Sequence, residues 1–267
     1  MFNEEQEIAD RYRQAVLAAE AAGKVLMSYF GRPMEIRKKG LIDLVTEADL
    51  AAEKEIVDRL GAAFPGDCFY TEETRRDPAE SADLWVIDPL DGTTNFSHGY
   101  PFFCVSIALR RRGRETLGVV LAPAFGELFT ACRGRGAFLN GNPIRCSSTG
   151  SLRESLLVTG FAYDIALHSD GVLRRFRNVL LRSQAVRRDG SAALDLCYVA
   201  AGRFDGFWEE HLKPWDTAAA RVVAEEAGGR VTTFSGGPFD IFGKEILASN
   251  GRIHGELLDA LNIPREG

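Results

Sequence analysis

Residues 85–96 read Trp85-Val-Ile-Asp-Pro-Leu-Asp-Gly-Thr-Thr-Asn-Phe96, an apolar run that stops at two carboxylates three residues apart. We expect Asp88 to end a β-strand, because Pro89 cannot donate to a strand ladder, and Gly92 to allow a sharp turn. The amides and hydroxyls of the next two threonines would then face the same pocket as the carboxylates. Hard oxygen ligands of this kind favour Mg²⁺ or Mn²⁺ over zinc. An ordinary Asp-Pro and Asp-Gly turn is the alternative, and the rest of the sequence must decide.

The composition is that of a globular chain without a basic surplus. The 267 residues carry a formal net charge of −6. This charge argues against nucleic acid or an anionic membrane as the main ligand, since both need a basic face. The densest basic runs are residues 110–112 and 187–188, which consist of arginine only. We interpret them as solvated strand or helix ends, with the border of an anion pocket as the alternative.

The N-terminal segment contains Glu4, Glu5 and Glu7 and no long apolar run. It lacks the pattern of a secretory signal or a transmembrane span, so we expect a cytoplasmic protein. The five cysteines are odd in number and form no Cys-x-x-Cys pair, which predicts neither a disulfide framework nor structural zinc. We interpret each as a small buried thiol: Cys68, Cys104, Cys132, Cys146 and Cys197.

Helical periodicity and β-like alternation both occur along the chain. The pattern predicts helices at 4–30, 46–63 (opened by a Thr46 to Asp49 capping box), 170–182, 191–201 and 214–227, and one ending near 261. It predicts strands at 68–71, 84–88, 103–111, 117–121, 127–132, 137–144, 155–159, 204–209, 230–232 and 245–248. We therefore expect one compact α/β protein with two sheet-containing lobes, divided near residue 150.

Three further acidic positions accompany the first motif. Glu72 follows the predicted strand 68–71, so its carboxylate can emerge at a strand end as that of Asp88 does. Asp216 falls in the first turn of a predicted helix that begins with proline, and Asp49 falls in the capping box of another. Helix ends stabilise such carboxylates without any ligand, so each position taken alone is compatible with a structural role.

Taken together, the motifs resemble those of the inositol monophosphatase family, whose members are Mg²⁺-dependent, lithium-sensitive phosphatases. The resemblance spans nearly the whole chain and rests on six segments in the family's order: Asp43-Leu-Val-Thr-Glu-Ala-Asp49, Glu72-Glu73, residues 85–96, Gly190-Ser-Ala-Ala-Leu-Asp195, Arg203-Phe-Asp-Gly-Phe-Trp-Glu209 and Lys213-Pro-Trp-Asp216. It implies a layered α/β fold, the αβαβα sandwich of the sugar phosphatases. It also implies a single phosphatase domain over 1–267, with the metal and phosphate site in about 1–150 and substrate recognition in about 151–267.

Carried over residue by residue, the resemblance implies two to three Mg²⁺ ions, for which Mn²⁺ could substitute. Glu72, Asp88 and the backbone carbonyl of Leu90 would bind the first ion. Asp88, Asp91 and Asp216 would bind the second, and Glu72 would also hold a weaker third ion.

The resemblance also implies catalytic and phosphate-binding groups. Asp49 and Thr93 would activate the attacking water, with Glu72 as a further catalytic residue. Gly92, Thr93 and Thr94 would contact the phosphate at a helix N-terminus. The family's early lysine falls on either Lys38 or Lys39, and the sequence leaves that choice open.

The substrate expected from the resemblance is a small phosphate monoester, myo-inositol 1-phosphate or a similar polyol phosphate. Glu209 matches a position that contacts inositol hydroxyls, and a carboxylate can accept hydrogen bonds from a diol. Ser191, Ala192 and Ala193 match a segment that borders the substrate, and Asp216 is also expected to contact it. An exposed acidic strand end is the structural alternative for Glu209. Fructose-1,6-bisphosphatase activity, alone or in addition, and a regulatory protein- or RNA-binding role are the functional alternatives, and a homodimer is expected.

Overall fold

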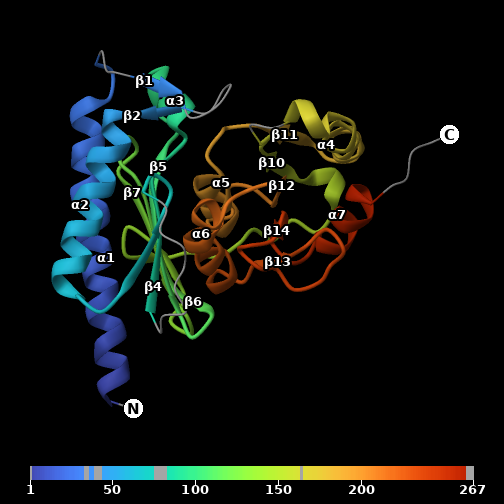
Figure 1. Ribbon diagram of the computed structural model, residues 1–267. Helices are drawn as coiled ribbons and strands as arrows, with labels where there is room; N and C mark the ends of the chain where they lie inside the picture. Colours follow the sequence, from blue (N-terminus) through green and yellow to red (C-terminus); the bar gives the residue numbers. More distant parts are fainter. Residues whose placement is uncertain (1, 33–35, 39–43, 75–82, 163–164, 263–267) are drawn as a thin grey trace.

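The computed structural model describes residues 2–32, 36–38, 44–74, 83–162 and 165–262. They form five layers, which Figure 1 shows side by side. Helices α1 (Phe2–Tyr29) and α2 (Glu47–Ala63) cover one face of a seven-stranded sheet. Helices α5 (Ala192–Ala200) and α6 (Pro214–Glu226) lie between that sheet and a five-stranded sheet. Helices α4 (Ile165–Leu180) and α7 (His254–Leu261) form the outer layer, which confirms the αβαβα sandwich.

The seven-stranded sheet is a meander in which sequence neighbours are also spatial neighbours. Its order is β3 (Cys68–Thr71), β4 (Asp83–Asp91), β5 (Cys104–Arg111), β6 (Arg114–Ala122), β7 (Glu127–Cys132), β8 (Ala137–Leu139) and β9 (Asn142–Pro143). Only the β3–β4 pair is parallel. The short loops of such a sheet are why its strands could be predicted from turn signals.

The five-stranded sheet has a mixed order that the sequence pattern does not reveal. It runs β11 (Ala185–Arg187), β10 (Leu156–Thr159), β12 (Gly206–Glu210), β14 (Glu245–Ser249) and β13 (Arg230–Thr232), with β10 parallel to both of its neighbours. Short elements absent from the periodic pattern are β11, the pair β1 (Ile36–Lys38) and β2 (Leu44–Thr46), the 3₁₀ turn η1 (Leu152–Glu154) and helix α3 (Thr93–Ser97), whose N-terminus only the family resemblance implied. Each has five residues or fewer, too few for a periodic pattern to be visible.

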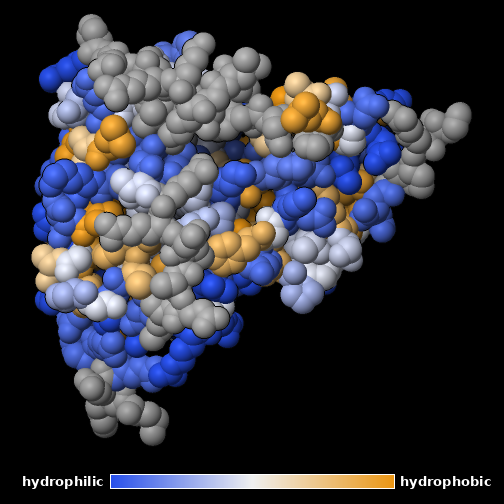
Figure 2. All heavy atoms as spheres, viewed as in Figure 1, coloured by the Kyte–Doolittle hydropathy of each residue, from blue (hydrophilic) through white to orange (hydrophobic). Residues whose placement is uncertain are grey.

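Strand β4 is apolar on both of its faces because helices cover both. Leu84 and Val86 pack toward α5 and α6, whereas Trp85 and Ile87 pack toward α1 and α2. Burying each such side chain contributes roughly 1.5–3 kcal/mol to stability. Hydrophobic residues on the face shown in Figure 2 are scattered among hydrophilic ones, so the main apolar layers lie inside the molecule.

A β-bulge at the end of β4 corrects the prediction that this strand stops at Asp88. Asp88 pairs with Ser106 and Asp91 pairs with Cys104, so three steps along β4 match two steps along β5. Residues three apart on a regular strand point to opposite faces, but the extra residue of a bulge puts both aspartates on the same face. Pro89 fits here because a bulge leaves a position without a ladder hydrogen bond.

Helix α6 lies unusually close to the seven-stranded sheet. A Cβ atom on Gly118 of β6 would lie only 2.2 Å from the carbonyl oxygen of Ala219, so any side chain would push the helix away. At the helix start, the Ser106 hydroxyl donates to the carbonyl oxygen of Trp215 over 3.2 Å. The first turn of α6, which contains Asp216, is thereby held against the bulged end of β4.

Candidate active site

A sharp turn joins β4 to the short helix α3. Gly92 has φ of 97°, and a Cβ atom there would lie 2.9 Å from the carbonyl oxygen of Phe102, so only glycine fits without strain. The amide of Phe96 donates to the Gly92 carbonyl over 3.0 Å, and Gly92 offers no side-chain cap. The first amides of a helix have no acceptor within the helix. The turn at Gly92 therefore supplies backbone N–H donors next to the two aspartates.

Thr93 and Asp49 are in contact, as the resemblance implied. Thr93 Oγ1 lies 3.2 Å from Asp49 Oδ1 and 3.0 Å from the carbonyl oxygen of Leu90, and its single proton can serve one of these acceptors at a time. The other Asp49 oxygen accepts from the amide of Thr46 over 2.8 Å and from its hydroxyl over 2.5 Å. The predicted capping box is confirmed, and it fixes the Asp49 carboxylate toward α3.

Asp91 joins the seven-stranded sheet to the start of α5. Its Oδ2 atom accepts from the Ser191 hydroxyl over 2.7 Å and from the Ala193 amide over 2.8 Å. Burial raises the pKa of Asp91 to about 6, and hydrogen bonds from this segment, including the Ala192 amide, act against that rise. Ser191 and Ala192 are thus brought next to the acidic group, at the N-terminus of α5.

Asp88, which is buried, and Asp216, which is half-buried, add two more carboxylates to this region. Asp88 is 2 % exposed and accepts from the Leu90 amide over 3.0 Å, and Asp216 accepts from the Lys213 amide over 2.7 Å. Burial raises the pKa of Asp88 well above its usual value, and the charges of Glu72, Asp91 and Asp216 raise it further. Burial and then the charge of Asp91 do the same for the pKa of Asp216.

Glu72 is held beside the end of β4 by its backbone, since its amide donates to the Ile87 carbonyl over 3.2 Å. Within the described part of the chain, no lysine or arginine makes an ion pair with Asp88, Asp91 or Asp216. Among the described residues, Asp88, Asp91 and Asp216 therefore lie at one place without an ion-pairing lysine or arginine.

These residues suit a hard divalent cation in chemistry. Among the described residues, no group of three or more histidine, cysteine, aspartate or glutamate side chains is arranged so that it could hold a metal ion as it stands. The donor set nevertheless consists of carboxylate and carbonyl oxygens, which Mg²⁺ prefers. A divalent cation would also remove the repulsion that raises the pKa of Asp88. The group fits Mg²⁺ on these two grounds, the type of donor and the uncompensated charge.

Glu209 is buried at the end of β12, not exposed as the structural alternative had it. Its side chain lies against the backbone of Gly160, where a Cβ atom would be 2.2 Å from Glu209 Oε2. Burial raises the pKa of Glu209 to about 8, while the positive charge of Arg188 lowers it and the charge of Asp91 adds to the rise. The glutamate therefore faces the acidic site from the five-stranded sheet.

Thr94 and the family's early lysine are the expected site residues that remain without a described contact to the acidic group. The Thr94 side chain is exposed, while its carbonyl oxygen accepts from the Ser97 hydroxyl over 2.9 Å. Lys38 belongs to β1, and Lys39 lies outside the described residues, so the choice between the two lysines stays open.

Cys104 lies next to Asp91, its Sγ 3.9 Å from Oδ2, and burial raises the pKa of its thiol. A thiol kept protonated in this way is a poor nucleophile.

Asn95, Gly160 and Asp195 of the site were missed by sequence reasoning. The Asn95 amide donates to the carbonyls of Phe102 and Asp189, over 2.7 and 2.8 Å, and so ties α3 to the segment before α5. The Gly160 backbone contacts Glu209, as described above. Asp195 is fully buried, and neither of its oxygens has a hydrogen-bond partner in the described structure. The available signal was an aspartate inside the otherwise apolar segment 192–200.

Five α/β layers and buried carboxylates beside a helix N-terminus define the layered sugar-phosphatase class of protein. The sequence matches the model of the inositol monophosphatase family over residues 7–264. The chain therefore belongs to the inositol monophosphatase family, and it is a phosphoric monoester hydrolase of that family.

Individual relatives agree with this assignment. The inositol-1-monophosphatase of Synechocystis is 46% identical over 92% of this chain and 87% of its own length. Nus factor SuhB of Salmonella typhimurium is 43% identical over 90% of this chain and 91% of its own. The solved inositol monophosphatase of Anabaena superimposes with a TM-score of 0.89 at 42% identity, covering 97% of this chain and 98% of that chain. In the part of the chain described, no helix is both long and apolar enough to span a bilayer.

Proposed function

We propose that the protein is a Mg²⁺-dependent phosphomonoesterase that hydrolyses myo-inositol 1-phosphate or a similar polyol phosphate. The proposal rests on the carboxylates of Asp88, Asp91 and Asp216, whose pKa values are raised by burial and by neighbouring carboxylates. We assign five groups as ligands of two to three Mg²⁺ ions: Glu72, Asp88, the Leu90 carbonyl, Asp91 and Asp216. Bound divalent cations would supply the positive charge that lowers the pKa of water and neutralises the leaving alkoxide.

The chain's own residues would orient water and phosphate. Asp49 is fixed by Thr46 and contacts Thr93, so this pair can accept a proton from a water placed beside it and hold that water in line. The amides that begin α3, at Gly92, Thr93 and Thr94, point their dipoles toward a bound phosphate. The sharp turn at Gly92 keeps the water-orienting and phosphate-binding groups on one side of the sheet.

The substrate part of the proposal rests on Glu209 and the start of α5. A buried carboxyl held against Gly160 is rigid, and it can exchange hydrogen bonds with vicinal hydroxyls in either protonation state. Ser191 and Ala192 are small, so a polyol ring could approach the backbone of α5 closely. The name of the 46% identical relative, inositol-1-monophosphatase, supports the same substrate class.

The test is phosphate release from inositol 1-phosphate, fructose 1,6-bisphosphate and 3′-phosphoadenosine 5′-phosphate, with Mg²⁺ and with chelator. We expect rapid release from inositol 1-phosphate that chelator abolishes, and inhibition by millimolar lithium. Faster release from fructose 1,6-bisphosphate would replace the proposed substrate by the bisphosphate. Equal rates with Mg²⁺ and with chelator would refute the metal site.

A second candidate function is regulatory binding to the transcription machinery or to RNA. One observation favours it: a relative that is 43% identical over nearly the whole chain is named Nus factor SuhB. Capture of transcription proteins by immobilised wild-type protein and by Asp88→Asn distinguishes the two roles, because a binding role would survive loss of the site. The same samples, measured by sedimentation, test the homodimer that the family resemblance implies.

A further inference from the structure

An arginine-lined cavity lies at the end of the seven-stranded sheet opposite the active site. It has a volume of about 870 Å³, and five of its eleven lining residues are arginines, whereas only Glu4 and Glu5 are acidic. Asp83 pairs with Arg111 at this end of the β4–β5 ladder, while Asp88 pairs with Ser106 near the other. Five residues along β5 separate the two, about 17 Å at the rise of a β-strand. The cavity is therefore distinct from the active site.

The arginines come from two tight turns that the chain places side by side. The β5–β6 hairpin turns through Arg112 and Gly113, both with positive φ (49° and 80°), so that Arg111 and Arg114 pair directly. The β7–β8 turn adds Arg133 and Arg135. A hydrogen bond from the Arg133 amide to the Thr116 carbonyl, over 2.9 Å, joins the two turns. Like charges gathered in this way repel one another, so the arrangement favours an anion between them.

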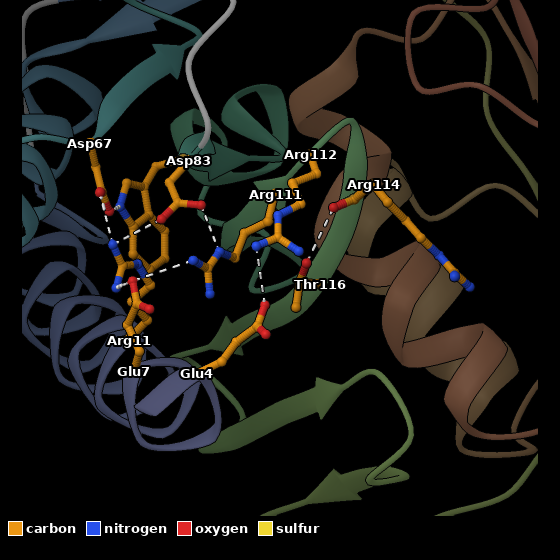
Figure 3. Close-up of polar contacts among 10 residues, drawn as sticks. Glu4, Glu7, Arg11, Asp67, Asp83, Arg111, Arg112, Arg114 and Thr116 are labelled. Carbon is orange, nitrogen blue, oxygen red and sulfur yellow. Dashed lines mark hydrogen bonds and ion pairs between the residues drawn. The ribbon is translucent and has the colours of Figure 1, made fainter. Parts of the chain in front are cut away.

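The carboxylates nearby neutralise only part of this charge. Arg111 lies between Asp83 and Glu7, with nitrogen–oxygen distances of 2.6 and 3.3 Å, and its Nη1 atom is buried without an acceptor (Figure 3). Arg133 pairs with Glu225, and its Nη2 atom likewise has no acceptor. These two guanidinium groups are held in place by the fold and still carry unused donors.

The outer arginines of the cavity are open to solvent. Arg112 reaches Glu4 at 3.6 Å in a pair whose side chains are 79% and 58% exposed, which solvent screens almost completely. Arg114 lies beyond this pair in Figure 3, and neither its guanidinium nor that of Arg135 is engaged by any described residue. Both side chains are exposed, so their charge is available for a ligand.

We propose that this cavity binds a small compound carrying two or more phosphate groups, such as a nucleoside diphosphate. Guanidinium groups match phosphate oxygens with paired donors, and several of them around one cavity suit more than one phosphate. The volume is that of a small-molecule site, and Ile8 and Cys132 give it apolar wall for a base or a carbon skeleton. The rim residues Glu4 and Glu5 disfavour an extended nucleic acid, which would need an unbroken basic surface.

The test is calorimetric titration of the full-length protein with ADP and with pyrophosphate, in chelator so that the active site holds no divalent ion. The variant is Arg114→Glu/Arg135→Glu, with Arg114→Ala/Arg135→Ala as a milder form. The matched control is Arg145→Glu/Arg153→Glu, which makes the same charge change at two exposed arginines outside the cavity. We expect saturable binding to wild type and control, and a loss of at least roughly tenfold in affinity in the cavity variants.

Three results would overturn the proposal. They are absence of saturable binding to wild type, equal affinity of wild type and both cavity variants, or equal losses in cavity variants and control. Binding of a short single-stranded RNA in place of ADP and pyrophosphate, with the same dependence on Arg114 and Arg135, would assign the surface to nucleic acid instead. Phosphatase activity of the cavity variants serves as the folding check, because neither arginine belongs to the proposed catalytic machinery.

Discussion

The two ends of strand β4 treat buried carboxylates in opposite ways. At its start, Asp83 is 9 % exposed and is paired with Arg11 at 2.9 Å and Arg111 at 2.6 Å, in the network that Figure 3 shows. At its end, Asp88 is 2 % exposed, and its nearest charged neighbours are other carboxylates, which raise its pKa. Among the described residues, two arginines pair with Asp83, whereas no lysine or arginine pairs with Asp88.

We interpret the Asp83 carboxylate as structural and the Asp88 carboxylate as a ligand of the proposed metal site. Burying an unpaired charge costs several kcal/mol, so a fold that only needed stability would pair or replace Asp88. Arg11 also contacts Asp67, whose other oxygen accepts from the Trp85 indole over 2.8 Å, so the carboxylates at the start of β4 belong to a network of ion pairs and hydrogen bonds. Four predictions test this contrast.

Asp88→Asn should have the largest effect on activity. We expect turnover with the best substrate to fall roughly 10³-fold or more, because the bridging carboxylate of the proposed metal site is lost. The free energy of unfolding in chelator, measured with urea, should stay equal or rise, since the substitution removes a repelling charge. Near-normal turnover, or a clear loss of stability, would show that Asp88 has a structural role like that of Asp83.

Asp83→Asn should reverse that pattern. It leaves Arg11 and Arg111 with a weakened partner in a buried network, so we expect the free energy of unfolding to fall by about 3–5 kcal/mol. Turnover per folded molecule, measured well below the melting temperature with the folded fraction taken from circular dichroism, should remain close to wild type. An unchanged urea midpoint would mean that the network is not structural.

Adding Mg²⁺ should stabilise the wild-type protein and sharpen the contrast further. A ligand that binds only the folded state at a hundred times its Kd adds about 2.7 kcal/mol. We expect the melting temperature to rise with Mg²⁺ in wild type and in Asp83→Asn, and to stay constant in Asp88→Asn. Sodium chloride at matched ionic strength is the control, and an equal rise with it would attribute the effect to screening.

Glu209 extends the comparison to the second sheet and should show the smallest effect. Its folded pKa of about 8 lies above the unfolded value near 4.5, so the folded state retains a proton that the unfolded state loses. Stability should therefore fall as pH rises from about 4.5 to 8, and Glu209→Gln should remove this slope, which is at most about 1.4 kcal/mol per pH unit. The measurement is urea unfolding of both proteins in chelator across that range. Parallel pH profiles would show that Glu209 does not carry the shift.

Much of the fold could be predicted from sequence because its signals are local. Strands β3, β7 and β13 have the predicted bounds, and helices α1, α2, α5 and α6 lie within a few residues of them. The order of the five-stranded sheet could not be predicted, because it depends on pairing between distant segments. The shortest elements also escaped, since they offer no periodicity to detect.

The candidate site likewise has features that could be predicted from sequence and features that could not. The expected carboxylates and Thr93 follow from motifs, and the structure brings them to one region. The bulge that turns Asp88 and Asp91 to the same face is a property of the β4–β5 register, which no single segment encodes. Likewise, the contact between Gly160 and Glu209 joins two strands far apart in sequence, so nothing in either segment alone indicates it.

Gly118 determines the spacing between two parts of this site. The separation between β6 and α6 is set by contact between main-chain atoms, with Gly118 facing the Ala219 carbonyl, and not by flexible side chains that could yield. Asp216 lies in the first turn of α6. The lack of a side chain at Gly118 therefore determines the distance between Asp216 and the aspartates of β4. A methyl group at position 118 would push α6 away from the sheet and so impair the site, although it would lie far from any reacting atom.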